Sequence, residues 1–221
     1  MDNVRKNITF PAILFWASLW GIVEATFGWL LHCAHVPGVG YILYPIALLC
    51  MTSAVSQTGR ARSAALVAFV AAAIKLFDLF LLGGRPFYYV TNPAAYIALE
   101  GCATAAFFHY VKFSETRNAI YYMRSFALGT LGFLGTFVAF KFWQAGMSAM
   151  VHYNPGVELF WQSSRIIPAV GQLLLKGAWL TVALYFYNRV LVKGGISQWR
   201  VSPSFAGVTA AIAVVITMVT F

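Results

Sequence analysis

The sequence predicts an all-α fold: a polytopic transmembrane helical bundle with a six-helix core and an appended seventh helix. Composition and the spacing of apolar runs carry this prediction. Of the 221 residues, 61% are hydrophobic and only 10% are charged, and the mean hydropathy is +0.75. A soluble domain would be about a quarter charged, so the chain has too little polar surface to cover a water-facing globule. The composition therefore excludes a soluble enzyme and a nucleic-acid-binding domain.

The apolar runs occupy most of the chain, which we expect to form one integral membrane domain over residues 1–221. Each run is long enough to cross a hydrocarbon core of about 30 Å at about 1.5 Å per residue. The first run is too long for a cleaved signal peptide and contains Glu24, so we expect it to remain as a helix. The last is short and is therefore treated as an appendage. The seven expected crossings are approximately 10–32, 39–57, 63–83, 93–112, 123–147, 164–191 and 204–221.

Turn-forming residues separate these runs and mark where each one ends. Gly, Pro and Asn end regular helices, and each break contains such residues or a short polar stretch. The breaks are Pro37-Gly38, Thr58-Gly59, Gly83-Gly84 with Pro86, Lys112 to Arg124, Asn154-Pro155-Gly156, and Gly194-Gly195 through Pro203.

The distribution of lysine and arginine predicts the orientation. Ten of them lie in the N-terminal segment and in alternate loops: Arg5, Lys6, Arg60, Arg62, Lys112, Arg117, Arg124, Arg189, Lys193 and Arg200. The opposite loops hold Arg85 and, at an edge, Arg165. Cytoplasmic loops are enriched in basic residues, so we expect a cytoplasmic N-terminus and, after seven crossings, a C-terminus outside.

Six ionisable residues fall inside the expected crossings: Glu24, Lys75, Asp78, Glu100, Lys141 and Lys176. Helix rise puts them about 8 to 16 Å from the outer ends of their segments, so five helices contribute charge to the outer half of the bundle. A charge at such depth is costly unless paired or hydrated. Two interpretations remain open. The residues line a polar cavity that opens outward, or they form internal ion pairs, as the i, i+3 spacing of Lys75 and Asp78 allows.

The cavity interpretation predicts a ligand-binding site formed by these six residues and Arg165. Lys141, Lys176 and Arg165 could receive a carboxylate or phosphate, whereas Glu24 and Glu100 could accept hydrogen bonds from ring nitrogens or hydroxyls. The near balance of charges argues against a highly charged solute. The cysteines form no close pair, and no metal-ligand spacing is present, so we predict neither a metal site nor a cofactor.

Motifs of known membrane enzymes and pumps are missing from the sequence. It contains no HExxH, no GxSxG and no Walker A loop, so the chain has no ATPase of its own. Catalysis by the buried carboxylates stays an open alternative, although nothing in the sequence sets a nucleophile beside a base. On balance we expect a protein that is not an enzyme.

Several stretches carry a family resemblance. They are Val36-Pro37-Gly38-Val39-Gly40, Leu43-Tyr44-Pro45-Ile46-Ala47, Thr58-Gly59-Arg60, and Asn92-Pro93 at the start of the fourth run. With the length, the alanine-rich third run and the missing ATPase motif, the chain resembles the substrate-binding S-components of energy-coupling-factor vitamin transporters over residues 10–192. That family typically has six helices and an alanine ridge on the first. Here seven crossings are expected, and the Ala64, Ala68 and Ala72 ridge lies on the third.

The resemblance implies a membrane transport subunit that binds a vitamin-like or micronutrient solute. Its partners would be a coupling transmembrane subunit and separate ATPases, and its place the bacterial inner (cytoplasmic) membrane, in contact with membrane lipid. Two alternatives stay open: a non-catalytic accessory subunit of a membrane complex, and a membrane enzyme that acts on a lipid or isoprenoid through the buried carboxylates.

Overall fold

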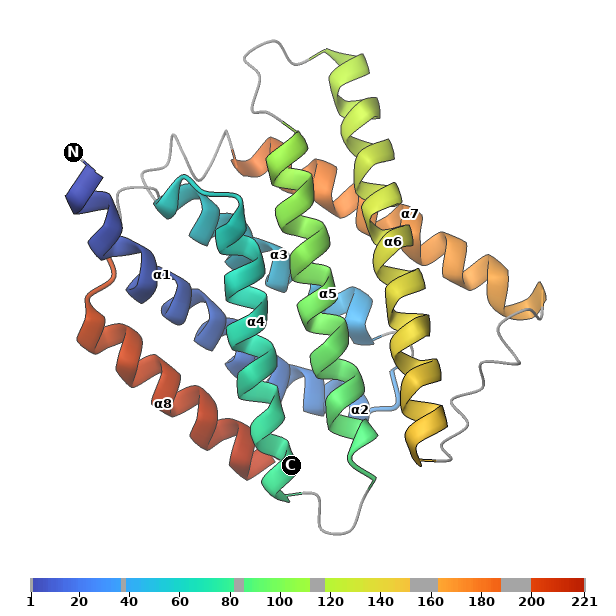
Figure 1. The fold of residues 1–221 in the computed structure, drawn as a ribbon, viewed down its shortest axis with the longest axis horizontal. Helices are drawn as coiled ribbons and strands as arrows, with labels where there is room; N and C mark the ends of the chain where they lie inside the picture. The colour runs from blue at the N-terminus through green and yellow to red at the C-terminus, as the bar shows by residue number, and fades with distance from the viewer. Residues whose placement is uncertain are drawn as a thin grey trace.

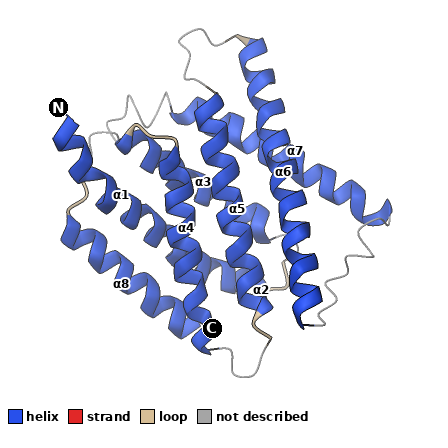
Figure 2. Cartoon of the chain, in the orientation of Figure 1, coloured by secondary structure: helices blue, strands red, loops and turns tan. Residues whose placement is uncertain are grey.

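The computed structural model describes residues 2–36, 39–81, 86–111, 118–151, 163–187 and 200–220, and every regular element in these ranges is helical (Figure 2). The elements are α1 (Asp2–Val23), η1 (Glu24–Gly28), α2 (Trp29–Cys33), α3 (Val39–Thr58), α4 (Arg62–Leu76), η2 (Phe77–Leu81), α5 (Tyr88–Tyr110), α6 (Ala119–Val151), α7 (Ser163–Phe186) and α8 (Pro203–Thr220). The all-α prediction is confirmed. Each predicted crossing corresponds to one of these helices or to a continuous run of them.

Five helical segments are long and apolar enough to cross a membrane: Phe10–Leu31, Val39–Thr58, Arg62–Phe80, Ala119–Met150 and Pro168–Phe186. The protein is therefore a membrane-embedded helical bundle. The α8 helix is shorter: its apolar segment, Pro203–Val219, has 17 residues, as its treatment as an appendage anticipates. The α5 helix is outside this set because it carries several polar residues, and it lies between α4 and α6, where protein rather than lipid covers its flanks.

The helices form two layers that cross one another (Figure 1). One layer contains α4, α5 and α6 in that order, and the other contains α8, α1, α3 and α7. Large side chains fill the space between them, among them Trp20, Tyr44, Met51, Phe133 and Leu180. The fourth helix begins five residues earlier than expected, so Pro93 lies inside α5. Pro93 lies in the second turn of α5, where it removes the hydrogen bond that a backbone N–H would make to the carbonyl four residues earlier.

Small residues set the spacing within the α4–α5–α6 layer. Ala64, Ala68 and Ala72 are buried, and a Cβ placed on Gly101 of α5 would lie only 2.1 Å from the Cβ of Ala68. The alanine ridge on α4 therefore packs inside the protein, against α5. Close approach of this kind is how membrane helices associate when their surroundings are as apolar as they are.

The first membrane helix changes its winding where its acidic residue lies. From Glu24 to Gly28 the backbone forms a π-helical turn, η1, between the α-helical segments α1 and α2. π-Turns are rare, widen the helix locally and occur frequently at functional sites. In this protein the turn begins at Glu24, so the change in winding sets the direction of a partly buried carboxylate.

Candidate functional site

A cavity of about 210 Å³ lies between the end of α1 with η1, α3 and α5, in the half of the bundle farther from the start of α1. Glu24 and Glu100 contribute carboxylates to its wall, and Trp20, Tyr44 and Tyr96 contribute aromatic rings. The remaining lining residues are apolar or have no polar side chain: Val39, Gly40, Leu43, Ala47, Pro93 and Ile97. For comparison, an engineered apolar cavity of about 150 Å³ holds benzene. The space therefore suits one substituted ring.

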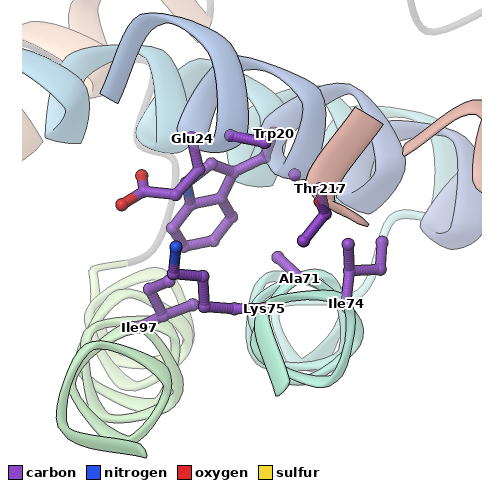
Figure 3. A pocket seen from close by; sticks show the side chains of 9 residues that line it. Trp20, Glu24, Ala71, Ile74, Lys75, Ile97 and Thr217 are labelled. Carbon is purple, nitrogen blue, oxygen red and sulfur yellow. The ribbon is translucent and has the colours of Figure 1, made fainter. Parts of the chain in front are cut away.

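Glu24 stands between this cavity and a second, much smaller pocket. The small pocket, about 10 Å³, is lined from α1, α4, α5 and α8, and Trp20, Glu24 and Ile97 border both spaces. Figure 3 shows the Lys75 side chain extending from α4 toward the Glu24 side of this pocket. Opposite charges on two helices thus approach each other beside the cavity.

Lys75 also pairs with an acid on its own helix. Its Nζ lies 2.7 Å from Oδ2 of Asp78, three residues further on in η2. Asp78 is only 1% exposed, so Lys75 provides a nearby positive charge for a carboxylate that solvent does not reach. This pair is the one that the i, i+3 spacing allows, and the ion-pair interpretation therefore holds for part of the charged set.

The second buried pair joins α5 to α7. Lys176 forms a hydrogen-bonded salt bridge with Glu100 and donates a second hydrogen bond, 2.9 Å long, to the Tyr96 hydroxyl. Lys176 is 2% exposed. Four aromatic rings surround its ammonium: Tyr96 at 4.4 Å, Tyr44 and Phe133 at 5.3 Å each, and Tyr41 at 5.8 Å from Nζ to the ring centroid. The aromatic cage compensates for part of the hydration that the lysine loses.

Hydrogen bonds fix the aromatic wall behind the cavity. The hydroxyls of Tyr44 and Thr104 are 3.3 Å apart, and Thr104 also donates to the backbone oxygen of Glu100 at 2.8 Å. The Tyr44 ring packs edge-on against Phe133. The wall that carries Glu100 is thus held from α3, α5 and α6 at once.

The structure brings five of the seven predicted ligand-binding residues into one neighbourhood: Glu24, Lys75, Asp78, Glu100 and Lys176. Lys141 is not part of it. Its Nζ donates to Gln144 of the same helix at 3.0 Å and lies 5.7 Å from the Phe137 ring. Arg165 belongs to α7, but its side chain lies outside the described part of the structure.

The aromatic side chains of the site are the feature that reasoning from charge alone did not find. Trp20 precedes Glu24 by four residues, and Tyr96 precedes Glu100 by four. Residues four apart share one helix face. Each cavity carboxylate therefore has a ring one turn away on its own helix, and a search for aromatic residues at that spacing would have found both.

The described ranges contain no group of three or more His, Cys, Asp or Glu side chains placed to hold a metal ion. What the cavity offers is aromatic surface, aliphatic surface and two carboxylates. Such a combination surrounds a small, flat, partly polar organic molecule and accepts hydrogen bonds from it.

Comparison with known proteins brings no relative to this chain: no protein-family model, no curated protein sequence and no solved structure matches it. The resemblance to S-components therefore stays a prediction, based on the residues quoted above. The site has to be interpreted from its own geometry.

Proposed function

We propose that this protein is a membrane transport subunit that binds a small, vitamin-like or micronutrient solute in the 210 Å³ cavity. The observation that carries the proposal is the pair of carboxylates, Glu24 from η1 and Glu100 from α5, on the wall of a cavity inside an apolar bundle. Ionisable groups inside membrane segments are expensive and usually serve a function. The π-turn at Glu24 and the three aromatic side chains that line the cavity support the same proposal.

Energy for transport would come from other subunits, because the sequence has no nucleotide-binding loop. Following the resemblance, these would be a coupling membrane subunit and ATPases. The excess of basic residues in alternate loops supports a cytoplasmic N-terminus. Under the proposal the cavity then opens toward the outer side of a bacterial cytoplasmic membrane, where a scarce solute would be captured.

Native mass spectrometry of the protein, extracted gently from its own host, tests this proposal directly. We expect a retained compound of a few hundred daltons, and Glu24→Gln should lose it while remaining monodisperse. Arg124→Gln is the matched control, because Arg124 is an exposed residue of α6 and the same type of charge-to-amide change is made away from the cavity. A protein that carries only bulk phospholipid and binds no added small molecule would refute solute binding.

One observation favours a second candidate, an accessory subunit of a membrane complex. In the Lys176–Glu100 pair, which joins α7 to α5, and in the Lys75–Asp78 pair, which lies within the α4–η2 run, each charge meets an opposite charge of the protein without any ligand. This candidate predicts that the chain purified alone is unstable and that gentle extraction recovers it bound to other membrane proteins. A stable, monodisperse chain with a retained solute would exclude it.

A further inference from the structure

We propose that the solute is a small organic monocation, such as an amine or a quaternary nitrogen attached to a ring, and that Glu24 is its counter-ion. The inference rests on the proposed function and adds the charge of the solute to it. It follows from the placement of charges around the cavity and from the aromatic surfaces that face it.

The cavity wall itself is acidic. Among the described residues that line it, two carry carboxyl groups, Glu24 and Glu100, and none is a lysine or an arginine. An anionic solute would lie close to carboxylates, with no cation among these lining residues, in a medium of low dielectric constant where like-charge repulsion is strong. The cavity is therefore unsuited to a carboxylate or phosphate.

Glu100 already has its counter-ion. Lys176 forms a salt bridge with it from behind the wall and is held there by the Tyr96 hydroxyl and by four rings. The ammonium is buried and does not line the cavity. The Glu100–Lys176 pair therefore has no net charge, and the net charge of the cavity wall comes from Glu24.

The lysine near Glu24, Lys75, also pairs with a second carboxylate. Lys75 borders the small pocket together with Glu24, but its Nζ also lies 2.7 Å from the buried carboxylate of Asp78. Within the described residues that surround the site, three carboxylates thus face two ammonium groups. Glu24 is partly buried, and a negative charge in such a place without a full counter-charge is costly, so one positive charge placed in the cavity would reduce this cost.

The aromatic residues provide surfaces that a cation prefers. Trp20, Tyr44 and Tyr96 line the cavity, and a cation over such a ring is attracted by its negative face. The protein already binds one ammonium group in this way, because the rings of Tyr44 and Tyr96 also lie within 5.3 Å and 4.4 Å of Lys176 Nζ. The same two residues would contact the bound cation from the cavity.

The test uses three probes that share a benzene ring and differ in charge: benzylammonium, benzyl alcohol and benzoate. Their affinities for the full-length protein are measured by calorimetry at fixed ionic strength, with the shift in melting temperature as a second readout. We expect benzylammonium to bind about tenfold more tightly than benzyl alcohol, which corresponds to one counter-ion contact of modest strength. Benzoate should not bind.

Glu24→Gln should reduce the preference for benzylammonium over benzyl alcohol to near unity, whereas Arg124→Gln should keep it. If Glu24→Gln fails to fold, the comparison of the three probes on the unmodified protein still shows whether the cavity prefers a cation. Equal or better binding of benzyl alcohol or benzoate would overturn the monocation while leaving solute binding intact. Failure of all three probes, together with a bare protein in native mass spectrometry, would overturn solute binding itself. A retained native compound that is neutral or anionic would overturn this inference alone.

Discussion

Lys176 contacts Tyr96 in two ways: its ammonium donates a hydrogen bond of 2.9 Å to the tyrosine hydroxyl and lies 4.4 Å from the centroid of the same ring. The two residues belong to α7 and α5, which lie in different layers of the bundle. Because Tyr96 also lines the cavity, the contact connects the packing of the layers to the shape of the site. The lysine thus holds in place a residue that lines the cavity.

The Glu100–Lys176 pair should be necessary for folding rather than for contact with the solute. Lys176→Met would leave the Glu100 carboxylate buried without its cation, and removing one member of a buried pair typically costs about 3 to 5 kcal/mol. We expect the melting temperature of the detergent-solubilised protein to fall sharply, with loss of monodispersity in gel filtration.

The double variant Lys176→Met with Glu100→Gln separates charge from packing. It should recover much of the lost stability, because no charge is then left unpaired. Lys141→Met serves as the control, and its cost should be about 1 kcal/mol or less, since its hydrogen bond to Gln144 joins two partly buried groups within one helix. A double variant as unstable as the single one would mean that the aliphatic stem and its packing matter more than the charge.

A second prediction concerns the contact between α4 and α5. Gly101→Ala would place a methyl group 2.1 Å from the Cβ of Ala68, so the helices would have to separate, at a cost of about 1 to 3 kcal/mol. Gly135→Ala is the matched control, because a Cβ there meets nothing within 4 Å. We expect thermal unfolding to show a clear loss for the first variant and none for the second. Rescue of Gly101→Ala by Ala68→Gly would identify the contact as the cause.

Hydrophobicity was enough to predict the helices, because about 20 apolar residues in a row have few other uses in a protein. The charges predicted the neighbourhood of the site, because charged side chains are too costly to face lipid and so turn inward. These residues are Glu24, Lys75, Asp78, Glu100 and Lys176. Spacing along the chain cannot show which helices are neighbours in space, so it could not predict that Lys176 pairs with Glu100. Lys141 instead donates a hydrogen bond within its own helix, to Gln144.

The winding of the first helix was also beyond the sequence-based prediction. No proline or glycine pair marks the start of η1, and packing against α3 and α8 distinguishes a π-turn there from a continuous α-helix. The turn brings Gly28 close to two residues that line the cavity, since a Cβ on Gly28 would approach Leu43 Cδ1 to 3.2 Å and the Glu24 carboxylate carbon to 3.8 Å. The position of the carboxylate is therefore a result of tertiary structure.

A third prediction tests whether the cavity is the binding site. Ala47 lines it and is 1% exposed, so Ala47→Leu should fill part of the space. Filling a cavity commonly stabilises a protein by about 0.5 to 2 kcal/mol, and we expect a higher melting temperature together with loss of benzylammonium binding. The same change at exposed Ala73 of α4 should alter neither quantity. Unchanged affinity in Ala47→Leu would place the solute elsewhere.

A fourth prediction tests the orientation of the chain with its own cysteines. Cys33 is exposed at the end of α2, whereas Cys50 is buried and Cys102, although exposed, lies in the middle of α5, where lipid would cover it. The Phe205 ring near the start of α8 packs 5.5 Å from Phe15, and 18 further residues of the first helix, roughly 27 Å, lead to Cys33. The start of α8 and Cys33 are therefore at opposite ends of the bundle (Figure 1).

With a cytoplasmic N-terminus, a membrane-impermeant maleimide added to intact cells should label Cys33. In a Cys33→Ser background, a cysteine introduced by Ser204→Cys, which lies exposed in the first turn of α8, should react only after the membrane is permeabilised. Labelling of both positions without permeabilisation would indicate leaky cells, and Cys33→Ser alone controls for the two remaining cysteines. The reverse pattern, with Ser204→Cys labelled from outside and Cys33 protected, would invert the protein and turn the mouth of the cavity toward the cytoplasm. A subunit that captures scarce solutes from outside could not work in that orientation, so this labelling experiment tests the direction of the proposed transport independently of any ligand.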